Sequence, residues 1–156
     1  MEKNIGENLL NQFLENIENW KSSKYLAVVE PPKEVEEILN SNSGTIKSWT
    51  SEECSIAAFR LYVYAEYIET EKVKEENILE WADSSVWYII STLMDNYGSP
   101  YDKWQKKYYS AVQENPLASE ILKIKNYSEA KVKTLNGKHN RIMKMADTLN
   151  NLARRK

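Results

Sequence analysis

The sequence predicts an all-α protein, and three observations lead to this fold class. The 156 residues include only four Gly and four Pro, whereas β architectures are dense in turns. Hydrophobic residues make up 42% of the chain, which is enough to form a core. Apolar side chains recur at spacings of three and four, the period of an amphipathic helix. We expect one domain over residues 1–156, an irregular bundle of five or six helices with a long basic C-terminal helix or helical pair.

The first third of the chain predicts two helices separated by a connector. Residues 3–21 place apolar side chains on one face of a helix. Residues 22–32 predict a connector, because the two prolines at its end interrupt any regular structure. A short helix is expected after Pro32, running through Leu39, and residues 40–44 predict a turn.

The middle of the chain predicts a buried helical hairpin. Thr50 and Glu53 have the spacing of a capping box, which places a helix start directly after Thr50. The stretch that follows is apolar on nearly every face, as is typical of a central, buried helix. Residues 76–97 predict another strongly apolar helix, ended by Gly98. We therefore expect residues 51–97 to form the buried hairpin of the bundle.

Two further start signals precede the C-terminal helices. Ser99 is a candidate N-cap, followed by Pro100 and by an acid at the third position. Asn115 and Pro116 repeat this device and open a last helix that runs to the end of the sequence. Gly137 interrupts the last helix, and the sequence leaves open whether it kinks the helix or divides it into two.

Charge is distributed unevenly along the chain, although the net charge is only −2. Residues 1–100 hold 8 Lys/Arg and 18 Asp/Glu, a net of −10, and form the expected acidic bundle portion. Residues 101–156 hold 13 Lys/Arg and 5 Asp/Glu, a net of +8, and form the expected basic helical arm. Such an asymmetry indicates either a polyanionic partner or self-association between the halves.

Five basic residues of the last helix gather on one side of it: Lys123, Lys133, Arg141, Lys144 and Arg155. At about 100° per residue they occupy an arc of about 80°, opposite the apolar side chains. The preceding helix has its own lysine cluster, and Tyr109 beside it is positioned to stack on a base. A phosphate backbone would relieve the repulsion within such a row by counterion release. The predicted nucleic-acid-binding residues are Lys103, Lys106, Lys107, Tyr109, Lys123, Lys133, Arg141, Lys144 and Arg155.

The leading functional hypothesis is a small non-enzymatic accessory protein that binds the backbone of nucleic acid. Lysine reads bases poorly, so binding would tolerate many sequences. Phage-type packaging, replication and recombination accessories have this general character, and we expect a homo-oligomer. A different interpretation is a solvated face that complements the acidic residues within the fold or across an oligomer. A protein-binding module or inhibitor that acts through the acidic N-terminal portion is the alternative function.

Two pairs of acids suggest an enzymatic alternative. Glu66 and Glu69 lie one turn apart, as do Glu80 and Asp83 on the next predicted helix. Four carboxylates from two helices can hold Mg²⁺ against a triphosphate. The spacing is similar to the ExxE…ExxD pattern of the all-α nucleotide pyrophosphohydrolases, a resemblance that covers about 18 residues and implies Mg²⁺-dependent hydrolysis. The same acids also fit solvated helix ends around a turn.

The remaining residues favour no cofactor. Cys54 is the single cysteine, so the chain has no internal disulfide, and we expect it to be a buried small hydrophobe. His139 lies on the apolar side of the last helix and is expected to be a packing residue. No apolar run approaches the ~18–20 residues of a membrane span. The sequence therefore predicts a cytoplasmic protein without a membrane segment, a metal or a cofactor.

Overall fold

The computed structural model describes residues 12, 15 and 30–156, and it confirms the all-α class. The chain divides into a unit of residues 1–30 and a unit of residues 31–156. The helix expected over residues 3–21 lies outside the described residues except for Gln12 and Glu15, which are helical, and so does most of the connector after it. The elements of the second unit are α2 (Lys33–Leu39), α3 (Ser43–Ser48), α4 (Ser51–Ile90), η1 (Met94–Asn96), α5 (Trp104–Glu114) and α6 (Pro116–Arg155).

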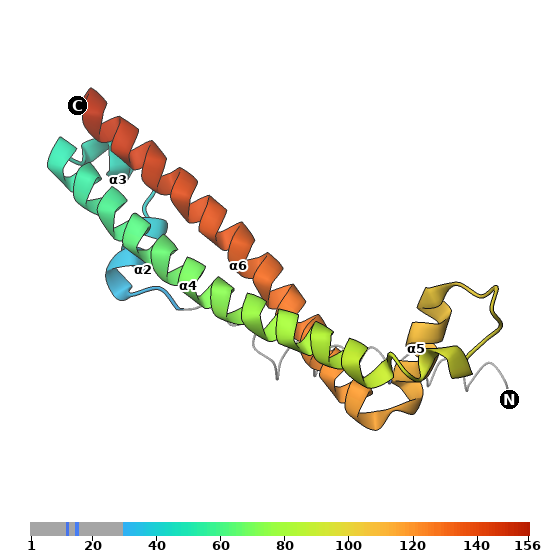
Figure 1. Cartoon of the computed structure of the whole chain (residues 1–156). Helices are drawn as coiled ribbons and strands as arrows, with labels where there is room; N and C mark the ends of the chain where they lie inside the picture. Colours follow the sequence, from blue (N-terminus) through green and yellow to red (C-terminus); the bar gives the residue numbers. More distant parts are fainter. Residues whose placement is uncertain (1–11, 13–14, 16–29) are drawn as a thin grey trace, which may run out of the picture. The chain divides into compact units, whose positions relative to one another are not determined.

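Helices α4 and α6 form an antiparallel hairpin that dominates the second unit (Figure 1). Each helix has 40 residues and is therefore about 60 Å long at 1.5 Å per residue. At one end, the hydroxyl of Ser51 donates a hydrogen bond to the carbonyl of Ala153, with an Oγ···O distance of 2.7 Å. Toward the other end, Lys125 forms an ion pair with Asp83 at 2.8 Å. The two helices thus remain in register along nearly their whole length.

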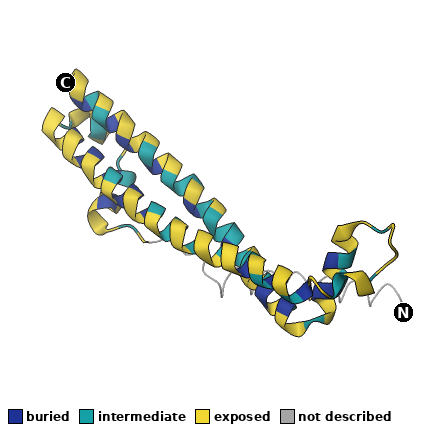
Figure 2. Cartoon of the chain, in the orientation of Figure 1, coloured by how far each residue is buried: buried dark blue, intermediate teal, exposed yellow. Residues whose placement is uncertain are grey.

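Small and branched side chains fill the space between α4 and α6. Figure 2 shows buried positions recurring along both helices. Leu61 and Ile68 of α4 and Leu135 of α6 are almost completely buried. Alanines at several of the buried positions let the two backbones approach closely, because a methyl group fills little space. The buried alanines are Ala57, Ala58, Ala65, Ala82, Ala118, Ala146 and Ala153. Cys54 is also buried, as expected.

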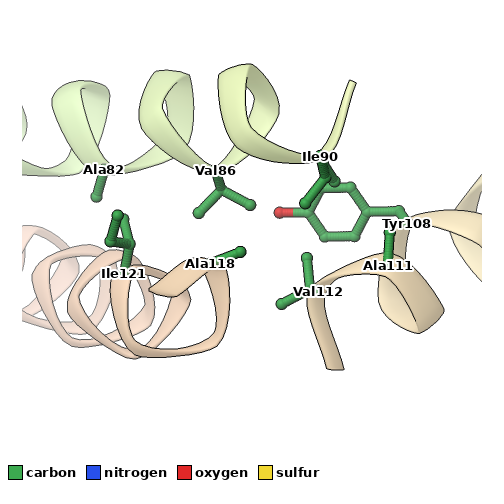
Figure 3. Close-up of a cluster of buried hydrophobic side chains, with 8 residues drawn as sticks. All are labelled: Ala82, Val86, Ile90, Tyr108, Ala111, Val112, Ala118 and Ile121. Carbon is green, nitrogen blue, oxygen red and sulfur yellow. The ribbon is translucent and has the colours of Figure 1, made fainter. Parts of the chain in front are cut away.

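A second apolar cluster holds α5 against the turn end of the hairpin. Figure 3 shows side chains of α4, α5 and α6 pointing toward one another. Tyr108 brings its ring between these helices, and its buried hydroxyl has no hydrogen-bond partner among the described residues. The members of the cluster are Ala82, Val86, Ile90, Tyr108, Ala111, Val112, Ala118 and Ile121.

The local start signals of the two long helices are confirmed. The Thr50 hydroxyl accepts a hydrogen bond from the N–H of Glu53, and the Glu53 carboxylate accepts one from the N–H of Thr50. The Asn115 side chain accepts a hydrogen bond from the N–H of Ala118, and Pro116 occupies the first turn. Both caps satisfy N–H groups that a helix leaves unpaired at its N-terminus.

The expected hairpin over residues 51–97 is wrong, because residues 51–90 form the single helix α4. The stretch between the two predicted helices contains no Gly or Pro. It is further supported by ion pairs one turn apart, Lys72 with Glu69 at 2.9 Å and Lys74 with Glu71 at 2.7 Å. The hairpin partner of α4 is therefore α6, and α4 ends at Ile90 rather than near Gly98.

The start of α5 also differs from the prediction. It begins at Trp104, because the carboxylate of Asp102 accepts a hydrogen bond from the N–H of Ser99 and closes a turn before the helix. Gly98, with a φ of 74°, directs the chain into this turn. In α6, the question left open at Gly137 is answered by a continuous helix.

We predict that Gly137→Ala stabilises the protein. A Cβ at position 137 would make an ordinary contact with the Arg141 guanidinium at 3.5 Å, so alanine fits the helix without a clash. The substitution should raise the free energy of unfolding by about 0.5–1 kcal/mol, measured by urea denaturation. Gly98→Ala is the control and should lower this free energy, since position 98 has a positive φ and a Cβ there would collide with Asp102. Destabilisation by Gly137→Ala would contradict a continuous α6.

Candidate functional site

The basic side chains of α6 divide into an inward set and an outward set. The inward set pairs with acids of α4 across the hairpin: Lys125 with Asp83, and Lys131 with Glu75, each at 2.8 Å. The inward ammonium groups are half-buried. His139 belongs to the same side of α6, where its Nε2 lies 3.8 Å from a carboxylate oxygen of Glu69.

Hydrogen bonding across the hairpin stabilises the charged form of the inward lysines. The hydrogen bond to Glu75 raises the pKa of Lys131, and the hydrogen bond to Asp83 raises the pKa of Lys125. Helix α4 carries nine acidic and three basic residues, a net charge of −6. Helix α6 carries nine basic and three acidic residues, a net charge of +6. The ion pairs of the inward lysines therefore place some of the opposite charges of α4 and α6 in direct contact.

The outward set is the basic ridge, which consists of Lys123, Lys133, Arg141, Lys144 and Arg155. All five side chains are exposed, and helical periodicity places them on the face of α6 opposite its packing with α4. Because α6 is one helix, the ridge extends without a break for about 48 Å at 1.5 Å per residue. The structure thus brings together the five residues of the last helix that the sequence predicted as nucleic-acid-binding.

The ridge does not take part in the pairing with α4. Lys123 pairs with Glu120 at 2.8 Å, and Lys133 pairs with Glu129 at 3.2 Å, both within α6 and on its surface. Exposed pairs of this kind contribute only about 0–1 kcal/mol, so an anionic ligand can replace the carboxylate at little cost. Arg141, Lys144 and Arg155 form no ion pair within the described part of the chain.

The four predicted residues near α5 lie on or next to this helix, and one of them belongs to an aromatic cluster. Lys103 and Lys106 are exposed, and Lys106 pairs with Asp102 at 3.3 Å, whereas Lys107 is half-buried. Tyr109 is 64% exposed. Its ring meets that of Tyr108 edge-on, with a centroid distance of 5.4 Å. The lysines and Tyr109 are thus close to one another on α5, as the sequence predicted.

Two exposed tryptophans in this cluster were not predicted as site residues. The rings of Trp87 and Trp104 lie 5.7 Å apart and both contact Tyr108, at 5.0 and 6.1 Å between centroids. Trp104 remains 54% exposed beside Lys103. Their helical spacing resembles that of core residues, so the sequence alone favoured a buried position for both.

The structure does not bring the two acid pairs together. Both pairs lie on the single helix α4. Glu80 and Asp83 follow Glu66 and Glu69 by 14 residues, which corresponds to about 21 Å along the helix axis. Each pair was expected on its own helix, and the two pairs do not converge within one chain. Asp83 is instead paired with Lys125. Among the described residues, no group of three or more His, Cys, Asp or Glu side chains is arranged to hold a metal ion.

Comparison with known proteins identifies no relative of this chain. No protein-family model matches the chain, and no curated protein or solved structure matches it. Within the described residues, none of the helices combines the length and the apolar character needed to cross a membrane.

We predict that Glu75→Gln destabilises the hairpin in a pH-dependent way. Loss of the pair with Lys131 should lower the free energy of unfolding by about 1 kcal/mol at neutral pH, measured by urea denaturation. The folded-state pKa of Lys131 lies above its ordinary value of 10.5, so the stabilisation is complete below that pH. It is lost as the pH rises through the folded-state value, and the variant and the wild type should then converge. The exposed neighbour Glu76→Gln is the control and should match the wild type at every pH.

Proposed function

We propose that this protein binds the phosphate backbone of nucleic acid through the basic ridge and the lysines of α5. In this proposal it is a non-enzymatic accessory protein of the cytoplasm, of the kind that supports phage-type packaging, replication or recombination. The observation that carries the proposal is the outward position of the ridge. Five cationic side chains occupy one face of a continuous helix, and none of them is engaged by the acids of α4.

Binding would be electrostatic in origin. Each phosphate contact releases condensed counterions, which favours association most at low salt. The packing against α4 fixes α6 as a continuous support, so the charges are held in position before a ligand arrives. Five of the six lysines on this surface are exposed, and Lys107 is half-buried. Their ammonium groups contact phosphates as point charges and do not read bases. The proposal therefore implies weak discrimination among sequences.

The aromatic cluster of α5 extends this proposal to single strands. Single-strand binders combine a basic surface with aromatic rings on which bases stack. Tyr109 and Trp104 are exposed on α5, the helix that also carries Lys106. This combination supports a contribution from base stacking in addition to phosphate contacts.

A protein-binding role is the second candidate, and one groove favours it. Between α2 and α4, Glu34, Glu37 and Glu53 line a groove together with Ile38 and Ile56. Arg60 also lines this groove and pairs with Glu34 at 3.4 Å, so the acids are in excess by two. A groove that combines acidic and apolar residues suits a basic, partly apolar segment of another protein. This candidate replaces the first if the protein shows no affinity for nucleic acid at low salt.

We predict that reversing two ridge charges weakens binding to DNA. The variant Lys133→Glu with Lys144→Glu should lose at least about tenfold in affinity for a labelled duplex at low salt, measured by fluorescence anisotropy. The slope of log affinity against log salt should become shallower by about two, because two phosphate contacts are lost. The loss should be the same for duplexes of unrelated sequence.

The matched control is Lys33→Glu with Lys47→Glu. It changes the net charge equally, but its exposed lysines lie on α2 and α3. This variant should retain most of the affinity. Equal losses in the two variants would mean that only net charge matters, which would contradict a binding surface on the ridge. The absence of any wild-type binding at low salt would refute the proposed function.

We predict that Tyr109→Ala weakens binding to single strands selectively. If a base stacks on Tyr109, its loss should cost about 1–3 kcal/mol, or roughly 5- to 150-fold in affinity, for single-stranded DNA. Affinity for a duplex, whose bases are already stacked on one another, should change little. Tyr101→Ala, at a tyrosine that is 97% exposed and precedes α5, is the control. Equal effects of Tyr109→Ala on both ligands would contradict stacking.

A further inference from the structure

Helix α4 carries a second apolar face that no other described element covers, apart from its start, where α2 borders Ile56. Its members are between 40% and 86% exposed, and exposed positions recur along the whole helix in Figure 2. At about 100° per residue they fall within an arc of about 100°, roughly opposite the side of α4 that packs against α6. We call this face the α4 stripe; it consists of Ile56, Phe59, Val63, Tyr67, Ile78, Trp81 and Tyr88.

The α4 stripe is too long and too apolar for an ordinary solvent-exposed helix face. It spans residues 56–88, about 48 Å at 1.5 Å per residue. Between Tyr67 and Ile78 it is interrupted by Thr70, Lys74 and Asn77. Soluble helices normally turn polar side chains toward water, whereas this one is apolar on two opposite sides. Contiguous apolar patches of several hundred Å² on a protein surface mark interaction sites. Near its C-terminal end, Trp81 and Tyr88 also line a shallow apolar groove together with Ile121.

The α4 stripe carries few charged side chains. Between residues 56 and 88, the only charged residues within its arc are Arg60 and Lys74. Arg60 pairs with Glu34 at 3.4 Å, and Lys74 pairs with Glu71 at 2.7 Å, so each charge is balanced within its own chain. The acids of α4 between residues 56 and 88 lie outside the arc, the nearest being Glu66 and Glu71 at about 20° from its edges. Although α4 carries a net charge of −6, its acids in this stretch flank the stripe, so two stripes would place no carboxylates directly against one another.

We propose that the α4 stripe packs against the α4 stripe of a second copy of this chain, in a two-fold symmetric dimer. A symmetric interface needs only one self-complementary patch. With a helix width of about 10 Å, a stripe of about 48 Å covers roughly 500 Å² per copy. The two copies together then bury about 1,000 Å², which reaches the lower limit of specific interfaces.

An antiparallel arrangement suits the distribution of side chains along the α4 stripe. A two-fold axis near Thr70 places Phe59 of one copy opposite Trp81 of the other, since both lie 11 residues from that point. The same axis brings Lys74 of one copy to the level of Glu66 of the other. Each α6 lies on the side of its α4 away from the interface, so both basic ridges remain accessible. The dimer does not depend on the proposed binding of nucleic acid.

The test is the mass of the full chain in solution. Sedimentation equilibrium or light scattering after size exclusion should give twice 18.2 kDa for the wild type at micromolar concentrations. Phe59→Glu and Trp81→Glu should each give 18.2 kDa with the far-ultraviolet circular dichroism of the wild type, because both side chains are more than half exposed on the helix. The control Tyr101→Glu, outside α4, should remain dimeric.

Two results would overturn the proposal. One is a wild-type chain that is monomeric at every concentration, which would leave the α4 stripe to a different protein or to another segment of the same chain. The other is a dimer whose dissociation constant is unchanged by both stripe variants. If either glutamate disturbs folding, the double variant Phe59→Ala with Trp81→Ala replaces it, since alanine is the best helix former. That variant should raise the dissociation constant at least tenfold, and an unchanged constant would equally overturn the proposal.

Discussion

The antiparallel packing of α4 against α6 is the interaction on which the rest of the second unit depends. Among the described residues, neither 40-residue helix has another apolar partner along most of its length, and the short helices α2 and α5 attach to this pair. Close contact is possible because alanines recur in the interface, from Ala57 to Ala153. Loss of this packing would expose one face of each helix at once, since the interface is continuous. The attraction between the helices is mainly hydrophobic, and the ion pairs between them fix which residues of α4 and α6 lie opposite one another.

The same packing separates the basic residues of α6 into an inward set and an outward set. The inward lysines are committed to carboxylates of α4, so they contribute to folding and are poorly placed to meet a ligand. The ridge lies on the other side of α6, where its cations repel one another along a single line. A helix with two opposed faces can therefore use similar residues for different purposes. Lys131 and Lys133 are only two residues apart, yet one is held by Glu75 and the other faces solvent.

Sequence reasoning succeeded where the relevant signal was local. The caps at Thr50 and Asn115 depend on residues three positions away, and the outward position of the ridge follows from helical period alone. It failed in the middle of α4, where a turn was expected although no Gly or Pro interrupts the helix. The acids near Glu75 resemble a solvated turn, but they continue a helix because α6 supplies a lysine opposite them. The exposure of Phe59 and Trp104 could not be predicted either, since apolar periodicity does not reveal what covers a face.

The hairpin has a consequence for the order in which the chain folds. The paired residues Asp83 and Lys125 are 42 positions apart, whereas Ser51 and Ala153 are 102 positions apart. Closing the longer loop directly costs about 0.8 kcal/mol more in chain entropy than closing the shorter one. Contacts beside α5 should therefore form first, with pairing then extending toward Ser51. Substitutions near Val86 would slow folding, while those near Cys54 would mainly accelerate unfolding.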